Sequence, residues 1–267
     1  MGMKKEKIKI AIFDIDDTLI KRGKVTVEAS ALQAINDLKE RGIEVLVATG
    51  RAFYFVHDAI HTSIAPNYYV TTNGACVYDK SENLIYKTRM EILEVKKMIA
   101  YAREKNLGIA LKMKDNMPVY HDLNIFKTVY MQGSAKQHIL EDRTQSNTLE
   151  SAPMGIFMMG DEALIERSKP LVPNGIYAKA YTNAYDIYSK KAGKIKGIEY
   201  VLEKLNLNWD NVIAFGDAAN DVEMIEKAYI GVAMGNSIDI LKEKADYTTT
   251  DIEADGVYLA LKHFDLI

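Results

Sequence analysis

The apolar positions in the first part of the chain follow the pattern of short buried strands that alternate with helices. Nearly continuous apolar runs at residues 8–13, 43–48 and 68–72 predict strands that are covered on both faces. Apolar residues recur at helical spacing over 25–41, and residues 52–63 are expected to form a second helix. This alternation predicts an α/β fold, a Rossmann-like three-layer core with a parallel sheet.

The pattern changes at about residue 81 and resembles that of an α+β domain. Irregular polar stretches, which hold four of the five prolines, separate the apolar segments here. Strands are expected at 109–113 and 155–159 and in a hairpin of 176–181 with 185–188, and helices at 91–106 and 161–168. We therefore predict a domain that is inserted into the first one.

The first pattern resumes after the inserted region. A helix is expected over 194–205, strands over 211–215 and 229–234, and a last helix over 256–264. The predicted organisation is a core domain made of residues 1–80 and 190–267, interrupted by an inserted α+β cap domain at 81–189.

Composition narrows the classes of function. The chain has 267 residues and a net charge of −3, which gives no electrostatic footprint for nucleic acid. No apolar run approaches eighteen residues and no signal-peptide pattern is present, so we expect no membrane association and a cytoplasmic protein. A single cysteine, Cys76, excludes an intramolecular disulfide and a metal cluster built from cysteines. The oligomeric state stays open.

Residues with polar groups follow four of the predicted strands at their carboxyl ends. These residues are Asp14, Asp16, Asp17 and Thr18; Thr49, Gly50 and Arg51; Asp217, Asn220 and Asp221; and Asn236. In a parallel sheet such exits lie at one edge, so residues about 200 positions apart can meet there. Crowded carboxylates require neutralisation, which Mg²⁺ supplies through oxygen ligands. The competing interpretation is a set of polar turns and helix caps, with Thr49 and Asp221 as caps.

The residue types at this edge favour one reaction class. Carboxylates, a hydroxyl and a lysine without a catalytic histidine suit acyl transfer poorly. They suit phosphoryl transfer, in which a carboxylate can be the nucleophile. Two lysines, Lys194 and Lys196, compete for the place near the carboxylates.

The chain resembles the haloacid dehalogenase superfamily, and within it the Cof-type sugar-phosphate phosphatases, which carry an inserted α+β cap. The resemblance rests on four motifs in order, which are Asp14-Ile-Asp-Asp-Thr18, Thr49, Lys196 and Gly216-Asp-Ala-Ala-Asn-Asp221. Lys196 is preferred to Lys194 because the lysine of this subfamily precedes a glycine. The resemblance implies a phosphatase of small phosphomonoesters.

It also implies a role for each motif residue. Asp14 would be the nucleophile that forms an aspartyl-phosphate, and Asp16 would be the general acid and base. Thr49 and Lys196 would complete the catalytic set. The substrate would be bound by Thr49, Gly50, Arg51, Asn220 and Lys196, and Mg²⁺ by Asp14, the carbonyl of Asp16, Asp217 and Asp221.

Two other functions remain open from the sequence. A phosphomutase of the same superfamily would return the phosphoryl group to an alcohol instead of water. A non-enzymatic phospho-receiver or ligand-binding module also uses an aspartate at the end of a strand with Mg²⁺. Asp16 argues against the receiver, because a receiver gains nothing from an acid and base two residues from its phosphoacceptor.

Overall fold

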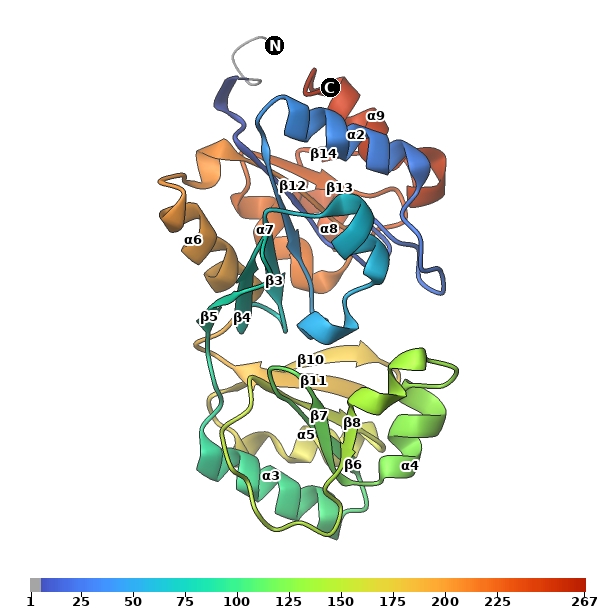
Figure 1. The fold of residues 1–267 in the computed structure, drawn as a ribbon, viewed down its shortest axis with the longest axis vertical. Coiled ribbons are helices and arrows are strands. Elements are labelled where there is room, and N and C mark those ends of the chain that lie inside the picture. Colours follow the sequence, from blue (N-terminus) through green and yellow to red (C-terminus); the bar gives the residue numbers. More distant parts are fainter. Residues whose placement is uncertain (1–5) are drawn as a thin grey trace. The chain divides into compact units, whose positions relative to one another are not determined.

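A computed structural model describes residues 6–267, and these form two compact units (Figure 1). The first unit comprises the chain up to Thr49, Val56–Tyr86 and Lys194–Ile267. The second comprises Gly50–Phe55 and Lys87–Gly193. Within the described residues, no helix is both long enough and apolar enough to cross a bilayer.

The first unit is built on an eight-stranded sheet with the order β14-β13-β12-β1-β2-β3-β4-β5. The six strands from β14 to β3 run parallel, and β4 pairs antiparallel with β3. The strands are β1 (Ile10–Phe13), β2 (Glu44–Ala48), β3 (Tyr68–Thr71), β4 (Cys76–Asp79), β5 (Leu84–Lys87), β12 (Val212–Gly216), β13 (Ile230–Ala233) and β14 (Tyr247–Thr248).

Helices cover both faces of this sheet (Figure 1). They are α2 (Ala29–Glu40), α6 (Lys194–Lys204), α7 (Val222–Lys227), α8 (Asp239–Lys244) and α9 (Gly256–His263). Helices α6 and α7 pack on one face, and α2 packs against β2 and α9. The order in which the chain joins β1 to β2 and β12 to β13 places these helices on opposite faces, because such crossovers are right-handed.

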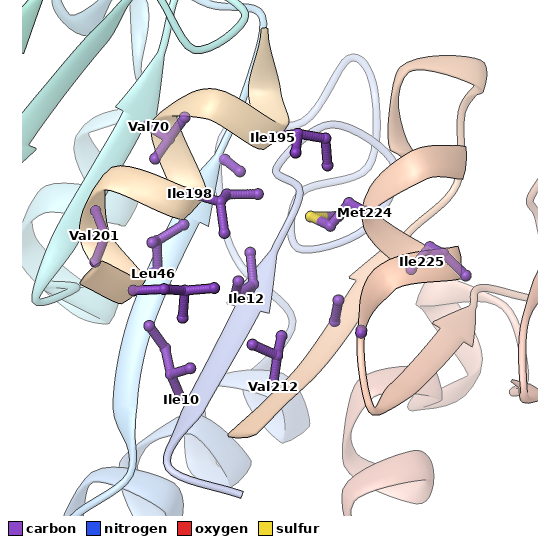
Figure 2. Packing of buried hydrophobic residues seen from close by; sticks show 14 of the residues in the cluster. Ile10, Ile12, Leu46, Val70, Ile195, Ile198, Val201, Val212, Met224 and Ile225 are labelled. Carbon is purple, nitrogen blue, oxygen red and sulfur yellow. The ribbon is translucent and has the colours of Figure 1, made fainter. Parts of the chain in front are cut away.

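The apolar residues of α6 and β1 pack against each other in one buried cluster, as their sequence patterns predict for a covering helix and a central strand. Figure 2 shows Ile195, Ile198 and Val201, one helical face, packed over the β1 side chains Ile10 and Ile12. Every residue of β1 is fully buried, as the continuous apolar pattern predicts for a central strand.

The predicted helix over residues 52–63 is wrong. The segment forms a 3₁₀ turn at Phe53–Phe55 and, after a break, a π-helical turn at Ile60–Ile64. Phe55 packs into the apolar core of the second unit, whereas Ile60 is buried in the first. Two cores therefore compete for one segment, and a continuous helix cannot serve both. The helix expected from residue 25 begins only at Ala29.

The second unit has a six-stranded sheet with the order β10-β11-β9-β6-β7-β8. Its pairs are antiparallel except for β7 with β8. The strands are β6 (Gly108–Lys112), β7 (Met117–His121), β8 (Leu140–Asp142), β9 (Gly155–Met159), β10 (Gly175–Tyr181) and β11 (Ala184–Ser189). The predicted hairpin is confirmed in β10 and β11.

Each face of this sheet has its own apolar cluster. Helices α3 (Ile92–Glu104) and α5 (Glu162–Arg167) cover one face. The other face carries α4 (Leu123–Ile125), the turn Phe126–Tyr130 and the segment Gly50–Phe55. The parallel core sheet and the inserted mixed unit confirm the predicted fold class.

Truncation of Ile198 tests whether α6 is held by its packing on the sheet. Ile198 is fully buried, so Ile198→Ala should lower the free energy of unfolding by about 2–5 kcal/mol, the usual cost of such a cavity. Urea unfolding followed by circular dichroism measures this loss.

Glu203→Ala is the matched control, because Glu203 lies exposed on the same helix and its change should stay within about 0.5 kcal/mol. Equal losses in the two variants would contradict this account of the packing.

Candidate active site

Three buried carboxylates meet at the carboxyl end of the parallel sheet. Asp14 follows β1 and Asp217 follows β12, and these strands are parallel neighbours in which Phe13 lies beside Phe215. Asp221 ends the 3₁₀ turn Ala219–Asp221 that comes after Asp217. One carboxylate oxygen from each of the three lies within 4.8 Å of the others. The predicted meeting of strand ends therefore occurs for these residues.

Lys194 is the cation of this cluster. It begins α6, and its Nζ donates hydrogen bonds to Asp14 Oδ1 at 2.8 Å and to Asp221 Oδ1 at 2.5 Å. Its side chain is only 4% exposed. A buried ammonium group is costly unless it is paired, and these two carboxylates supply the pairing.

Asp221 is held in place by donors on both of its oxygens. Oδ1 accepts from Lys194, and Oδ2 accepts from the backbone amides of Asp217 at 3.2 Å and Ala218 at 3.1 Å. The expectation that Asp221 merely caps α7 is therefore not met, since it stands at the N-cap without a side-chain capping bond. Gly216 makes room for this carboxylate, because a Cβ there would lie 2.5 Å from the Cβ of Asp221.

The hydroxyl of Thr18 contributes a bond that the sequence did not reveal. It donates to Asp217 Oδ1 at 3.2 Å and so ties the first motif to the fourth. The only signal for this bond in the sequence was that a hydroxyl stands at the same sheet edge as the carboxylates.

Asp16 and Thr49 belong to the same unit as the cluster. Asp16 is half-buried, and its backbone forms an isolated β-bridge with that of Ile20. Thr49 is buried at the end of β2, where its amide donates to Val70 O at 2.8 Å and its carbonyl accepts from the Asn73 amide at 3.1 Å. It caps no helix, since the helix expected after it does not form.

The structure does not bring Lys196 to the carboxylates. Its side chain is 62% exposed and pairs with Glu199 at 3.2 Å. Two positions along an α-helix rotate a side chain by about 200°, so Lys194 and Lys196 point to opposite sides. The predicted placement of Lys196 is corrected to Lys194.

The remaining predicted substrate residues lie outside the cluster. Gly50 and Arg51 belong to the second unit, in which the Gly50 carbonyl accepts from Lys112 Nζ at 3.2 Å and Arg51 Nη1 donates to Phe55 O at 3.1 Å. Asn220 lies exposed in the turn before Asp221. The substrate contacts predicted for these three residues stay predictions.

Crowding of charge shifts the pKa values of the cluster. Burial raises the pKa of Asp14 well above its usual range; Lys194 opposes this, while Asp221 and Asp217 add to it. Burial, with the charge of Asp221, raises the pKa of Asp217 to about 7. Burial lowers the pKa of Lys194, but Asp14 and Asp221 outweigh that effect and leave it above its ordinary value.

The donor set fits a hard divalent cation. Such ions bind carboxylate and carbonyl oxygens, and Asp14, Asp217 and Asp221 offer carboxylate oxygens within 4.8 Å of one another. Burial and the charge of Asp221 raise the pKa values of Asp14 and Asp217. A cation would favour their ionised forms, since an opposite charge within a few ångströms lowers the pKa of a carboxyl group.

Comparison with known proteins shows the family. The family model described as haloacid dehalogenase-like hydrolase matches residues 11–261. A Streptococcus pyogenes protein, whose name proposes a bifunctional phosphatase and peptidyl-prolyl cis-trans isomerase, is 30% identical over 270 residues. That match covers 99% of this chain and 55% of the relative, so the chain spans about half of that protein's length.

Other relatives match over their whole length. A Bacillus subtilis protein named 5-amino-6-(5-phospho-D-ribitylamino)uracil phosphatase is 27% identical and covers 97% of this chain and 96% of its own. A solved structure described as a sugar phosphatase of subclass IIB is 26% identical, with a TM-score of 0.84 over 97% of this chain and 100% of that one.

These matches confirm the resemblance noted in the sequence and the predicted enzyme class, a phosphoric monoester hydrolase. The buried cluster of Asp14, Asp217 and Asp221, with Lys194 between two of its members, combines residues of the first and fourth motifs at the carboxyl end of the parallel sheet. The chain belongs to the family of haloacid dehalogenase-like hydrolases.

Proposed function

We propose that the protein is a Mg²⁺-dependent phosphatase that hydrolyses a small phosphorylated metabolite through an aspartyl-phosphate on Asp14. The observation that carries this proposal is the buried Lys194, which bridges Asp14 and Asp221 beside Asp217. A buried carboxylate that is paired with a lysine and lies within reach of a metal site has the setting of an activated nucleophile.

The attack requires an ionised Asp14. Burial opposes ionisation, and the ammonium group of Lys194 favours it. As the oxygen of Asp14 bonds to phosphorus, Lys194 remains beside it and stabilises the negative charge on the phosphoryl oxygens. Thr49 supplies a hydroxyl to the phosphoryl group, and Asp221 keeps Lys194 oriented from its other side.

Asp16 serves as the general acid and base. It stands two residues after Asp14 and is half-buried, so the residue is accessible from solvent. It protonates the alcohol oxygen as the ester bond breaks, and it then takes a proton from the water that hydrolyses the aspartyl-phosphate.

Asp14, Asp217 and the backbone carbonyl of Asp16 would hold Mg²⁺. When bound, the ion supplies positive charge that polarises the phosphoryl group. In this proposal Asp221 does not bind the ion directly, because Lys194 and two backbone amides donate hydrogen bonds to its oxygens.

The proposed substrate is a sugar phosphate or a similar phosphomonoester. The Bacillus subtilis relative is named for a phosphorylated ribityl compound, and the solved neighbour is described as a sugar phosphatase. We propose that the inserted region 81–189, with Gly50 and Arg51, selects the alcohol part of the substrate. The isomerase activity in the name of the longer relative is not part of the proposed function.

Removal of the nucleophile tests the reaction. Wild-type protein with Mg²⁺ should release phosphate from p-nitrophenyl phosphate and from members of a panel of sugar phosphates. Asp14→Asn should lower kcat by about a thousandfold or more, because an amide cannot take up the phosphoryl group. Absence of phosphate release by the wild type from every ester of the panel would overturn the proposal.

The two lysines offer a matched pair of variants. Lys194→Met should lower kcat by about a hundredfold or more, because it removes the cation beside the nucleophile. Lys196→Met should change kcat less than about twofold, since Lys196 is exposed on the opposite side of α6. Steady-state phosphate release measures both, and a larger loss in Lys196→Met would contradict the assignment of Lys194.

The raised pKa of Asp217, about 7 without a cation, predicts that stabilisation by metal depends on pH. Between the usual carboxyl pKa, about 4, and 7, the folded chain keeps a proton that the unfolded chain has lost. Its free energy of unfolding therefore falls as pH rises through this window. Mg²⁺ binds the ionised form, so its stabilising effect should grow over the same window.

Thermal unfolding with and without Mg²⁺ at about pH 5.5 and about pH 8 measures this dependence. The rise in Tm on addition of Mg²⁺ should be larger at the higher pH. Asp217→Asn has no carboxyl group to titrate and should lose most of the difference. An equal rise in Tm at both pH values in the wild type would contradict the prediction.

A further inference from the structure

The residue after Asp16 has an unusual backbone conformation. Asp17 has a φ of 59°, in the left-handed region, where residues other than glycine are uncommon and Asp and Asn are the best tolerated. Such a conformation persists only where neighbouring groups hold it. The direction in which the chain leaves Asp16 therefore depends on what holds Asp17.

All the polar groups of Asp17 are engaged. Its amide donates to Ile20 O at 2.8 Å, and its Oδ1 accepts from the Arg22 amide at 2.8 Å. Its carbonyl accepts from Nδ2 of Asn236 at 2.8 Å. The first two bonds lie within the loop that follows β1. The third comes from Asn236, 219 positions away, and so it fixes this loop to another part of the first unit.

Asn236 is itself fixed at its other end. Its Oδ1 accepts from the Ile252 amide at 3.0 Å. One partner is a carbonyl and the other an N–H group, so only one orientation of the side-chain amide satisfies both. The side chain thus joins the loop after β1 to the segment after β14.

The segment that carries Asn236 also contacts the other side of the carboxylate cluster. Two residues later, the amide of Ile238 donates to the backbone carbonyl of Asp217 at 3.0 Å. The stretch 236–238 therefore binds the backbone beside Asp16 and the backbone of Asp217. A second link joins the same two segments, because Lys24, in the loop after β1, forms an ion pair at 3.0 Å with Glu253, which follows Ile252.

We propose that Asn236 is a positioning residue for Asp16. Its bond to the Asp17 carbonyl holds the left-handed turn that sets where the Asp16 carboxyl group lies relative to Asp14. The inference rests on the proposed function, because it concerns the acid and base of that reaction. Asn236 needs no contact with the substrate for this role.

The role has a chemical signature. An alkyl leaving group, such as the alcohol of a sugar phosphate, needs a proton from Asp16 as it departs, whereas p-nitrophenolate departs without one. The value of kcat/KM reports the steps up to departure of the leaving group. Displacement of Asp16 should therefore lower kcat/KM for alkyl esters and leave kcat/KM for p-nitrophenyl phosphate nearly unchanged.

Two variants separate the bonds of Asn236. Asn236→Asp keeps an acceptor for the Ile252 amide but loses the donor to the Asp17 carbonyl, and Asn236→Ala loses both. Each should lower kcat/KM about tenfold for the alkyl ester that the wild type hydrolyses fastest, and less than about twofold for p-nitrophenyl phosphate. Equal losses on the two esters would overturn the proposal.

Asn211→Asp is the matched control. Asn211 bridges two segments in the same way, since its Nδ2 donates to Lys7 O at 3.1 Å and its Oδ1 accepts from the Asn208 amide at 3.1 Å. It precedes β12 and so lies at the opposite end of that strand from the cluster. Its variant should show no difference between the two esters, and the same preferential loss there would overturn the proposal.

Hydrogen exchange separates failure of this inference from failure of the proposed function. Amides of residues 17–20 should exchange several-fold faster in Asn236→Ala than in the wild type, whether or not the protein hydrolyses any ester. Unchanged exchange would overturn the positioning role by itself. A wild type that hydrolyses neither ester, with faster exchange in the variant, would overturn the function and leave the loop contact supported.

Discussion

The site depends on one electrostatic constraint, which is that three carboxylates are buried close together beside a single ammonium group, that of Lys194, which hydrogen-bonds two of them. Burial raises the pKa values of Asp14 and Asp217, the charge of Asp221 adds to both shifts, and Lys194 opposes them. Such a cluster is costly in a folded chain. A divalent cation bound among these carboxylates would offset part of this cost.

The fold meets this constraint with rigid elements. The parallel pairing of β1 and β12 places Asp14 and Asp217 at adjacent strand ends. Lys194 is the first residue of helix α6, so the start of this helix fixes the position of the lysine beside the carboxylates. Asp221 reaches Lys194 only because Gly216 has no side chain. Two backbone amides and Lys194 orient the carboxylate of Asp221, and the hydroxyl of Thr18 orients that of Asp217.

The spacing of apolar residues in the sequence predicted the strands and most of the helices, and the parallel direction of the strands predicted which of their ends lie together. Continuous apolar runs identified the parallel strands, and the rule that the ends of such strands share an edge correctly predicted that Asp14 and Asp217 meet. The choice between Lys194 and Lys196 depended on the rotation of one helix relative to the sheet, which a local pattern does not contain. The break within 52–63 likewise arose from competition between two cores.

The bond between Asn236 and Asp17 could not be predicted from sequence either. It joins two loops that are 219 positions apart, and an asparagine after a strand is first read as a turn residue. What the sequence did contain was the coincidence of polar residues at one sheet edge. The contacts among those residues are a matter of tertiary geometry.

The assignment of Gly50–Phe55 to the second unit has a consequence for how the chain could be divided. The polypeptide passes between the units four times, after Thr49, Phe55, Tyr86 and Gly193, although the insertion proper has only two junctions. A minimal core made by joining Tyr86 directly to Lys194 would retain Ala52 and Phe55 without the apolar cluster that buries them. Deletion of residues 87–193 would therefore expose apolar side chains on the remaining chain, because Ala52 and Phe55 belong to the hydrophobic core of the second unit.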